Sequence, residues 1–209
     1  MSQVPLVDPQ PPAGVRKDEL RRRLRAARRS QVPGRDREED GRALAEVVLA
    51  ALGDLRSALP HGTVCRVAAY EARPTEPPTQ ELIRRLVETG CDVVVPVTRP
   101  DHTLDWAVTN GGEHPAYGEQ VGDEALAEAT LVVTPGLAVD AAGTRLGQGG
   151  GSYDRALAHR RPGTPVVTLL WDDELLGTVS LPREEHDLPV DAVVTPGRGW
   201  VWLSRGSAR

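Results

Sequence analysis

The stretch GTRLGQGGGSYDRAL, from Gly143 to Leu157, combines a cation, a carboxylate and a tyrosine with unusually bare backbone. Four of the five residues from 147 to 151 are glycine. Each glycine costs chain entropy when it is ordered, so a purely structural turn rarely needs four of them. The composition therefore favours a ligand that lies directly on main-chain amides.

A glycine-rich loop that runs into the start of a helix is suited to binding an anion. Ser152 is a good N-cap, and the free amides of Gly149–Tyr153 would carry the positive end of the helix dipole. Arg145 can fork onto phosphate oxygens. Asp154 could hold a Mg²⁺ ion that bridges those phosphates, because this ion prefers one or two carboxylates and keeps its waters. The alternative is a glycine-rich surface turn in which Asp154 only stabilises the helix dipole.

Three glycine patterns of known chemistry fit the stretch to different degrees. The P-loop fails because no lysine follows the glycines, and the serine nucleophile elbow fails because Asp154 occupies the place of its second glycine. The run GxGxxS from Gly147 to Ser152 resembles the dinucleotide fingerprint, with Asp172 as a ribose-binding acid. However, about a dozen residues separate the run from the preceding expected strand, whereas the fingerprint's turn is immediate. A NAD(P)-binding oxidoreductase therefore stays open as an alternative.

The composition is that of an ordinary globular protein. With 209 residues, 39% of them hydrophobic, the chain fits one large domain. A net charge of −5 argues against a nucleic-acid or anionic-membrane partner, and no apolar run is long enough to span a bilayer. Cys65 and Cys91 lack CxxC spacing and are interpreted as small buried hydrophobes in a reducing compartment. We expect a cytoplasmic protein that is a monomer, with a weak dimer as the alternative.

Short apolar runs alternate with helical patterns along the chain. Residues 1–14 are expected to be a disordered tail, and residues 15–209 a single domain. Helices are expected from Val15, from Pro33, over 78–90 and over 152–159; strands over 62–70, 92–97, 104–108, 129–135, 165–171 and 191–195; a terminal edge strand at 199–203; and a loop over 111–122. Continuous Val- and Leu-rich runs between amphipathic helices indicate an α/β three-layer, Rossmann-like fold with a mostly parallel sheet.

The first helix carries an apolar stripe with cations beside it. Leu20, Leu24 and Ala27 form the stripe, and Lys17, Arg21 and Arg28 fall within about 40° of one another at its border. Lys17 is the only lysine among 25 basic residues, so it could mark a position that needs a compact ammonium group. The helix is interpreted either as a basic, solvated surface helix or as the edge of a cleft lined by these cations.

Several motifs, in order along most of the chain, resemble those of the 5-formyltetrahydrofolate cyclo-ligase family, also called 5,10-methenyltetrahydrofolate synthetases. RLGQGGGSYDR, from Arg145 to Arg155, looks like the family signature RLGxGxGxYDR. The upstream VVTPGLAVDAAGTRLG resembles the family's lead-in to that signature. The flanking motifs are the K-x-x-x-R of Lys17 and Arg21, the E-x-x-T of Glu76 and Thr79, and the H-D-x-x-x-D of His186, Asp187 and Asp191.

The resemblance implies an enzyme with a CoA-transferase-like fold that uses ATP and Mg²⁺. The family cyclises 5-formyltetrahydrofolate to 5,10-methenyltetrahydrofolate and releases ADP and phosphate. The formyl oxygen would be phosphorylated to an iminium phosphate, which the neighbouring 10-nitrogen attacks. Because no protein nucleophile is required, catalysis can consist of positioning and of stabilising charge on the moving phosphoryl group. A non-catalytic nucleotide- or folate-binding protein is a further alternative.

The resemblance also implies a role for individual residues. Lys17 and Arg145 are the catalytic cations. The expected ATP-binding residues are Lys17, Arg21, Arg145, Leu146, Gly147, Gln148, Gly149, Gly150, Gly151, Ser152 and Tyr153. The expected folate-binding residues are Glu71, Glu76, Trp106, Tyr117, Gln148, Ser152 and Tyr153, of which Trp106 and Tyr117 could equally be ordinary core or rim aromatics. The expected Mg²⁺ ligands are Asp154 and Asp187, with Asp191 as the alternative to Asp187.

Three positions depart from the family pattern. Ser152 replaces a frequent tyrosine, and Val139 stands where phenylalanine is common. The usual Gly-x-x-Glu-Pro is represented only by YGEQVG, which leaves the role of Glu119 open. None of these departures removes a phosphate- or metal-binding group, so they bear on the fit of the folate rather than on the activity.

Overall fold

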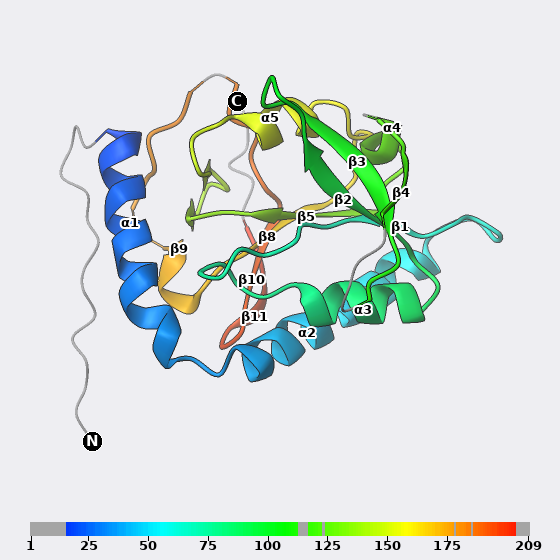
Figure 1. Ribbon diagram of the computed structural model, residues 1–209, viewed down its shortest axis with the longest axis horizontal. Coiled ribbons are helices and arrows are strands. Elements are labelled where there is room, and N and C mark those ends of the chain that lie inside the picture. The colour runs from blue at the N-terminus through cyan, green and yellow to red at the C-terminus, as the bar shows by residue number, and fades with distance from the viewer. Residues whose placement is uncertain (1–15, 113–116, 123, 178, 185, 204–209) are drawn as a thin grey trace.

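The computed structural model describes residues 16–112, 117–122, 124–177, 179–184 and 186–203, and within them an eight-stranded sheet runs through the molecule (Figure 1). The five central strands β10, β8, β5, β1 and β2 are parallel, and β11, β3 and β4 pair antiparallel at the two edges. In spatial order the strands are β11 (Gly199–Trp202), β10 (Ala192–Thr195), β8 (Val166–Leu169), β5 (Leu131–Pro135), β1 (Arg66–Ala68), β2 (Asp92–Thr98), β3 (Leu104–Thr109) and β4 (Tyr117–Gln120). The mostly parallel sheet predicted from the sequence is confirmed.

Helices cover both faces of this sheet (Figure 1). The helices on one face are α2 (Arg37–Ser57) and α3 (Gln80–Glu88), and those on the other are α4 (Glu124–Ala127) and α5 (Ser152–Leu157). Successive residues of a strand point to opposite faces. Accordingly, Val67 and Val93 join the core under α2 and α3, whereas Ala68 and Val94 join the core under α4 and α5. Because both faces are buried, the central strands are apolar throughout, and this continuous apolar pattern is why the three-layer fold could be predicted from the sequence.

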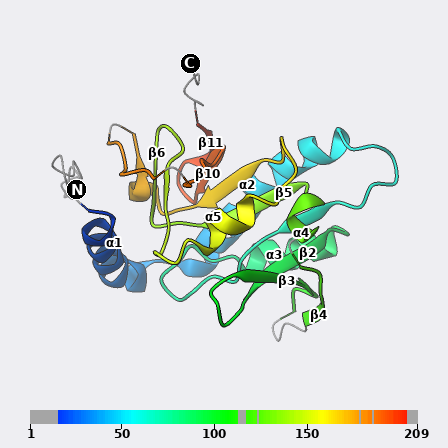
Figure 2. The same cartoon turned by 90° about the horizontal axis from the view of Figure 1, so that it is seen from above.

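The first helix, α1 (Lys17–Gln31), stands at one end of the molecule (Figures 1 and 2). It packs on a second, three-stranded sheet, in the order β7 (Arg145–Leu146), β6 (Ala138–Asp140) and β9 (Leu175–Leu176). Leu20 is buried there against Leu146 and Leu176, with Leu24 beside it. The predicted apolar stripe is therefore the surface that docks α1. The small sheet was not expected, because strands of two or three residues carry too short a pattern to detect.

Several boundaries differ from the sequence-based expectation. The strand expected over 62–70 is confined to Arg66–Ala68, and the segment expected to be a loop over 111–122 contains β4, which pairs with β3. The helix expected from Pro33 begins at Arg37, after a 3₁₀ turn (η1, Val32–Gly34). Asp36 caps that helix by accepting a hydrogen bond from the Glu39 amide at 3.0 Å.

The expected disordered tail over 1–14 falls outside the described residues. Among the helices that the structure describes, none has the length and apolar character needed to cross a membrane. Cys65 and Cys91 are buried free cysteines, as the sequence predicts.

Candidate active site

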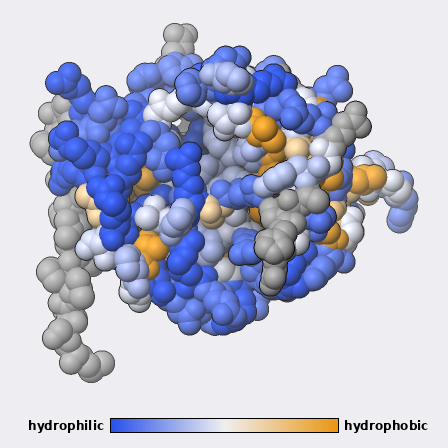
Figure 3. Space-filling model, viewed as in Figure 1, coloured by the Kyte–Doolittle hydropathy of each residue, from blue (hydrophilic) through white to orange (hydrophobic). Residues whose placement is uncertain are grey.

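A large cleft opens at the carboxyl ends of the central strands, next to α1 (Figure 3). Its walls include Tyr70 and Glu76 beyond β1, Pro96 and Thr98 at the end of β2, and Pro135 at the end of β5. From β1 the chain continues to β2 on one side and later returns to β5 on the other. In open α/β sheets, such a switch in strand order leaves a crevice at the carboxyl ends where ligands bind. The topology thus predicts a ligand site at this cleft.

The glycine-rich stretch forms one wall of the cleft, between β7 and α5. Gly149 and Gly151 have φ values of +114° and +62°, which a residue with a side chain rarely adopts. Gly151, and not Ser152 as the sequence suggested, is the N-cap of α5. The Ser152 hydroxyl instead donates a hydrogen bond of 2.7 Å to the carbonyl of His102, in the turn between β2 and β3. The glycines expose the backbone, and Ser152 fastens the loop to that turn.

Helix α1 delivers cations to the opposite wall. Lys17 and Arg21 line the cleft, and Arg21 Nε donates to the carbonyl of Gly147 at 3.1 Å. A Cβ added at Gly149 would lie 3.5 Å from the Arg21 guanidinium, an ordinary contact distance, so it is the positive φ and not the approach of Arg21 that requires glycine there. The helix and the glycine loop, far apart in sequence, are therefore in direct contact across one cleft.

Two other arginines of α1 differ from the expectation. Arg28 does not border the cleft: it is buried, donates to both carboxylate oxygens of Glu174 at 2.6 and 2.7 Å, and reaches the Gly136 carbonyl at 2.5 Å. Arg25, which the sequence analysis did not single out, donates to the side-chain oxygen of Gln148 at 2.9 Å and also to the Gln148 carbonyl. Its position four residues after Arg21, one helical turn further, was the available signal.

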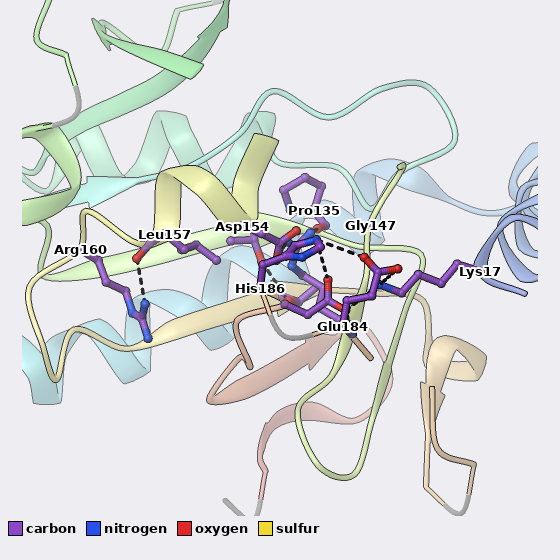
Figure 4. Close-up of polar contacts among 12 residues, drawn as sticks. Lys17, Pro135, Gly147, Asp154, Leu157, Arg160, Glu184 and His186 are labelled. Carbon is purple, nitrogen blue, oxygen red and sulfur yellow. Dashed lines mark hydrogen bonds and ion pairs between the residues drawn. The ribbon is translucent and has the colours of Figure 1, made fainter. Parts of the chain in front are cut away.

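Lys17 bonds two carboxylates in the segment before β10 (Figure 4). Its Nζ lies 2.6 Å from Asp187 and 3.1 Å from Glu184. Burial alone would lower the pKa of Lys17, but hydrogen bonds and charge from Asp187 and Glu184 outweigh it and raise that pKa above its ordinary value. Burial likewise opposes ionisation of Asp187, yet the Lys17 ammonium and the Glu184 amide hold the pKa of Asp187 below its usual range. Both groups are therefore charged at neutral pH.

Arg145 and Asp154 form the second ion pair of the cleft. Arg145 Nη2 lies 3.0 Å from Asp154 Oδ1, and Nη1 donates to the Pro135 carbonyl at 3.3 Å. The guanidinium carbon also lies 5.7 Å from the centre of the Tyr153 ring, within cation–π range. Within the described residues, Arg145 Nε and the Tyr153 hydroxyl are buried without a hydrogen-bond partner. Such unpaired donors are costly in a folded protein, and both residues line the cleft.

Two carboxylates, Glu76 and Glu71, line the cleft wall beyond β1. Glu76 is buried; one of its oxygens accepts from the Arg73 amide at 2.9 Å and the other from the Gln148 side-chain amide at 3.3 Å. Gln148 thus joins Arg25 on α1 to Glu76 in a polar chain across the cleft. Glu71 also lines the cleft and accepts hydrogen bonds of 2.8 Å from the Tyr117 hydroxyl at both carboxylate oxygens.

Some predicted site residues lie elsewhere. Trp106 has no exposed surface and packs edge-on to Tyr153 in the core, so it cannot stack on a ligand. Tyr117 is half-exposed and approaches the cleft only through its bond to Glu71. Asp191 accepts a hydrogen bond from the Val166 amide at the start of β8 and is not among the residues that line the cleft. The side chain of Glu119 lies outside the described residues.

Leu146 and Val139 serve the core. Leu146 is 2% exposed, so its side chain packs under α1 and only its backbone is open to a ligand. Val139 is fully buried in the layer under α5. The missing phenylalanine at position 139 therefore affects packing beneath the site and not its lining.

The dinucleotide-binding alternative is wrong. The glycine stretch follows β7 of the small sheet and not a parallel strand of the main sheet. Asp172, the proposed ribose ligand, accepts hydrogen bonds of 2.5 Å from the Thr195 hydroxyl and 3.0 Å from the Gly197 amide. It braces the end of β10 and does not line the cleft.

Several further cleft residues were not predicted from the sequence, among them charged or titratable ones. Arg16 lies one position before α1, Arg73 and His102 lie in loops after β1 and β2, and Glu184 precedes Asp187 by three positions. The loops after parallel strands carry the ligand-binding residues in this kind of sheet, and this rule was the signal available for Arg73 and His102. Glu184 carried no comparable signal.

Fold and site together define a class: an α/β protein with a cleft at its topological switch point that is lined by glycines and basic side chains. The model of the 5-formyltetrahydrofolate cyclo-ligase family matches residues 13–196, and the chain belongs to that family. It is thereby a ligase of folate and one-carbon metabolism, and its membership supports a 5-formyltetrahydrofolate cyclo-ligase activity.

Individual relatives agree with the family assignment. The chain is 36% identical over 200 residues to a 5-formyltetrahydrofolate cyclo-ligase from Mycolicibacterium smegmatis, covering 90% of this chain and 97% of the relative. It is 34% identical over 148 residues to the protein of the same name from Escherichia coli, covering 65% and 80%.

Solved structures share the fold. The 5,10-methenyltetrahydrofolate synthetase of Aquifex aeolicus superposes with a TM-score of 0.62 at 24% identity, over 92% of this chain and 94% of that one. The corresponding protein of Mycoplasma pneumoniae gives 0.61 at 16% identity, over 87% and 99%. At these identities the similarity bears on the architecture alone.

Proposed function

We propose that this chain catalyses the ATP- and Mg²⁺-dependent cyclisation of 5-formyltetrahydrofolate to 5,10-methenyltetrahydrofolate, with release of ADP and phosphate, and that residues 15–209 act as one domain. The observation that carries the proposal is the convergence of Lys17, Arg21 and the glycine loop on one cleft. A triphosphate needs exposed amides and several cations from more than one direction. The cleft offers both.

The glycine loop and the basic side chains have different roles in binding the nucleotide. The amides of residues 147–153 receive phosphate oxygens, while Lys17, Arg21 and Arg145 neutralise their charge. Lys17 and Arg145 are now paired with Asp187 and Asp154. Both cations exchange a carboxylate for the phosphates when the nucleotide binds, and Arg145 Nε, which has no partner among the described residues, then donates a hydrogen bond to a phosphate oxygen.

The reaction requires activation of a formamide, whose carbonyl is a poor electrophile. The formyl oxygen attacks the γ-phosphorus of ATP, and the bond from that phosphorus to the ADP oxygen breaks. The resulting iminium phosphate is attacked at its formyl carbon by the 10-nitrogen of the folate, which loses its proton. Cleavage of the carbon–oxygen bond then releases phosphate and leaves the methenyl bridge. Lys17 and Arg145 stabilise the charge on the phosphoryl group during transfer, and the protein supplies no nucleophile.

The carboxylates that the two cations hold fit a magnesium ion. Asp154 and Asp187 both line the cleft, and oxygen ligands of this type, together with phosphate oxygens and water, are what Mg²⁺ prefers. When bound, the ion neutralises charge on the β- and γ-phosphates. Glu184 and His186 lie within 4.8 Å of Asp187 in a cluster able to hold a cation, so they are neighbouring donors.

The folate occupies the part of the cleft beyond β1 and β2. Glu76 is held there by Arg73 and Gln148, and its carboxylate suits a pterin ring that is rich in hydrogen-bond donors. Tyr153 provides the aromatic wall. Glu71 and Tyr117 form a bonded pair at the margin, and Trp106 supports Tyr153 from behind instead of touching the substrate.

The test is a direct assay. Protein, 5-formyltetrahydrofolate, ATP and Mg²⁺ are mixed, and the absorbance of the methenyl product and the release of ADP are followed together. We expect equal amounts of both products, and no reaction when ATP is left out or Mg²⁺ is chelated. Thermal protection by ATP and folate without turnover would instead identify a non-catalytic binding protein and refute the proposal.

A further inference from the structure

Two cysteines with no part in the proposed reaction lie side by side at the other end of the sheet. Cys65 and Cys91 immediately precede Arg66 and Asp92, which are paired residues of the parallel strands β1 and β2. Neighbouring strands run about 4.8 Å apart, within the Cα separation of about 4.4 to 6.8 Å that a disulfide accepts. Both side chains enter the same core cluster, and their sulfur atoms are 3.6 Å apart. Little movement is needed to join them.

The surroundings of the pair favour a thiolate at one of the two sulfurs. Arg56, near the end of α2, places Nη1 3.8 Å from Cys91 Sγ and is itself held by the carbonyl of Thr89 at 3.1 Å. The Thr89 hydroxyl lies 3.8 Å from the same sulfur. The contact with Cys65, together with those with Thr89 and Arg56, outweighs burial and lowers the pKa of Cys91 to about 6, whereas the pKa of Cys65 is raised. Cys91 is thus suited to attack and Cys65 to complete the bond.

We propose that Cys65 and Cys91 form a dithiol that hydrogen peroxide oxidises to an intramolecular disulfide. The Cys91 thiolate attacks one peroxide oxygen, the oxygen–oxygen bond breaks, and a sulfenic acid forms with loss of hydroxide. The Cys65 sulfur then attacks the Cys91 sulfur and displaces its oxygen as water. In total, the two thiols lose two electrons and two protons, and one peroxide becomes two waters.

Burial restricts which oxidants and partners can take part. Cys65 is 4% exposed and Cys91 7%, so a second protein cannot reach either sulfur, and an oxidant must be as small as hydrogen peroxide. The dithiol also lies at the amino ends of β1 and β2, whereas the cleft lies at their carboxyl ends. The disulfide would close a loop that includes α3 and also cleft residues such as Glu71 and Glu76, but the bond itself would form at the opposite ends of the strands from the cleft. Oxidation is therefore expected to stabilise the fold and to leave the activity of the cleft unchanged.

The test is oxidation of the reduced full-length protein with a small excess of hydrogen peroxide. We expect both thiols to disappear, the intact mass to fall by two hydrogen atoms, and a peptide that links Cys65 to Cys91 to appear on non-reducing digestion. Dithiothreitol should reverse all three changes. Peptide mapping separates this result from oxidation of Met1, the only methionine. The oxidised protein should also melt at a higher temperature than the reduced protein.

Matched variants separate the disulfide from general oxidation. In Cys65→Ser a hydroxyl donor stays beside Cys91 but no disulfide can form, so the sulfenic acid at Cys91 should be trapped when the oxidised protein is unfolded in the presence of dimedone, and the melting temperature should not rise. In Cys91→Ala, Cys65 should react far more slowly. Oxygen atoms added to either cysteine of the unmutated protein without loss of two hydrogens, or crosslinking between chains, would overturn the proposal. So would thiols that survive peroxide in the folded protein.

Discussion

Lys17 is the residue on which the proposed chemistry depends most directly. Lys17→Gln keeps a polar side chain but removes the ammonium that pairs with Asp187 and lines the cleft. If this charge acts on the phosphoryl group in transfer, the variant should lose about 2 to 4 kcal/mol of transition-state stabilisation, and kcat/KM should fall by the corresponding factor. The measurement is the rate of methenyl formation at saturating and at low ATP. Arg23→Gln, at an exposed position of the same helix, is the control and should keep its activity. Unchanged turnover in Lys17→Gln would remove the residue from the mechanism.

Asp154 has a structural partner as well as a proposed metal, and the two roles can be separated. Asp154→Asn keeps the size and an acceptor oxygen but deprives Arg145 of its counter-charge. We expect a higher Mg²⁺ concentration for half-maximal rate and a loss of about 2 kcal/mol in stability, because a buried charged donor loses a strong acceptor. Magnesium titration of the rate measures the first effect and urea unfolding the second. A variant that loses stability but responds to Mg²⁺ as before would assign Asp154 to the ion pair alone.

At the scale of elements, α1 and the glycine loop form two walls of one cleft and are joined by hydrogen bonds. Arg25 holds Gln148 by its side chain and its carbonyl, and Gln148 in turn bonds Glu76. Arg25→Met should break this series of hydrogen bonds. KM for the folate and KM for ATP should both rise, each by a factor that corresponds to about 1 to 2 kcal/mol of binding free energy. Arg29→Met, on an exposed turn of the same helix, is the control. Steady-state kinetics with each substrate varied in turn give the answer; a change confined to ATP would show that Gln148 does not pass the effect to Glu76.

The attachment of α1 depends on a buried ion pair outside the cleft. Arg28 and Glu174 are 2% and 4% exposed and bond through two hydrogen bonds. Arg28→Met leaves the Glu174 carboxylate buried without its partner, which should cost about 3 to 5 kcal/mol in urea unfolding. Adding Glu174→Leu should recover most of the loss, because an apolar pair needs no counter-charge. If the single and the double variant are equally unstable, the cost arises from lost packing and not from the charge.

Motif and periodicity predicted the parts of the site that repeat a simple pattern. The stripe around Leu20 placed α1 against the molecule, and the spacing of Lys17 and Arg21 put both at the cleft. Ser152 was mistaken for the N-cap because a hydroxyl before a helix usually caps it, whereas the left-handed Gly151 takes that place and frees Ser152 for the His102 carbonyl.

Other contacts could not be read from local sequence. An aromatic near a motif can be core or pocket, and only burial shows that Trp106 belongs to the core. On the helical wheel, Arg28 lies nearer to Lys17 than Arg25 does. In the structure, however, Arg28 is buried in an ion pair with Glu174, and it is Arg25 that contacts Gln148 of the glycine loop. The two arginine contacts join residues more than 100 positions apart, so they are decided by the tertiary fold.

At the scale of the whole molecule, α1 should be as necessary to the cleft as the central sheet, although it lies at one end. A chain that begins at Val15 retains Arg16, Lys17 and the rest of α1, so we expect the stability and kcat/KM of the full chain. A chain that begins at Val32 loses every α1 cation and uncovers the apolar cluster around Leu146 and Leu176. It should melt at a lower temperature and gain no thermal protection from ATP with Mg²⁺. Calorimetry of the three chains with and without nucleotide makes the comparison, and nucleotide protection that survives removal of α1 would mean that the glycine loop alone binds the phosphates.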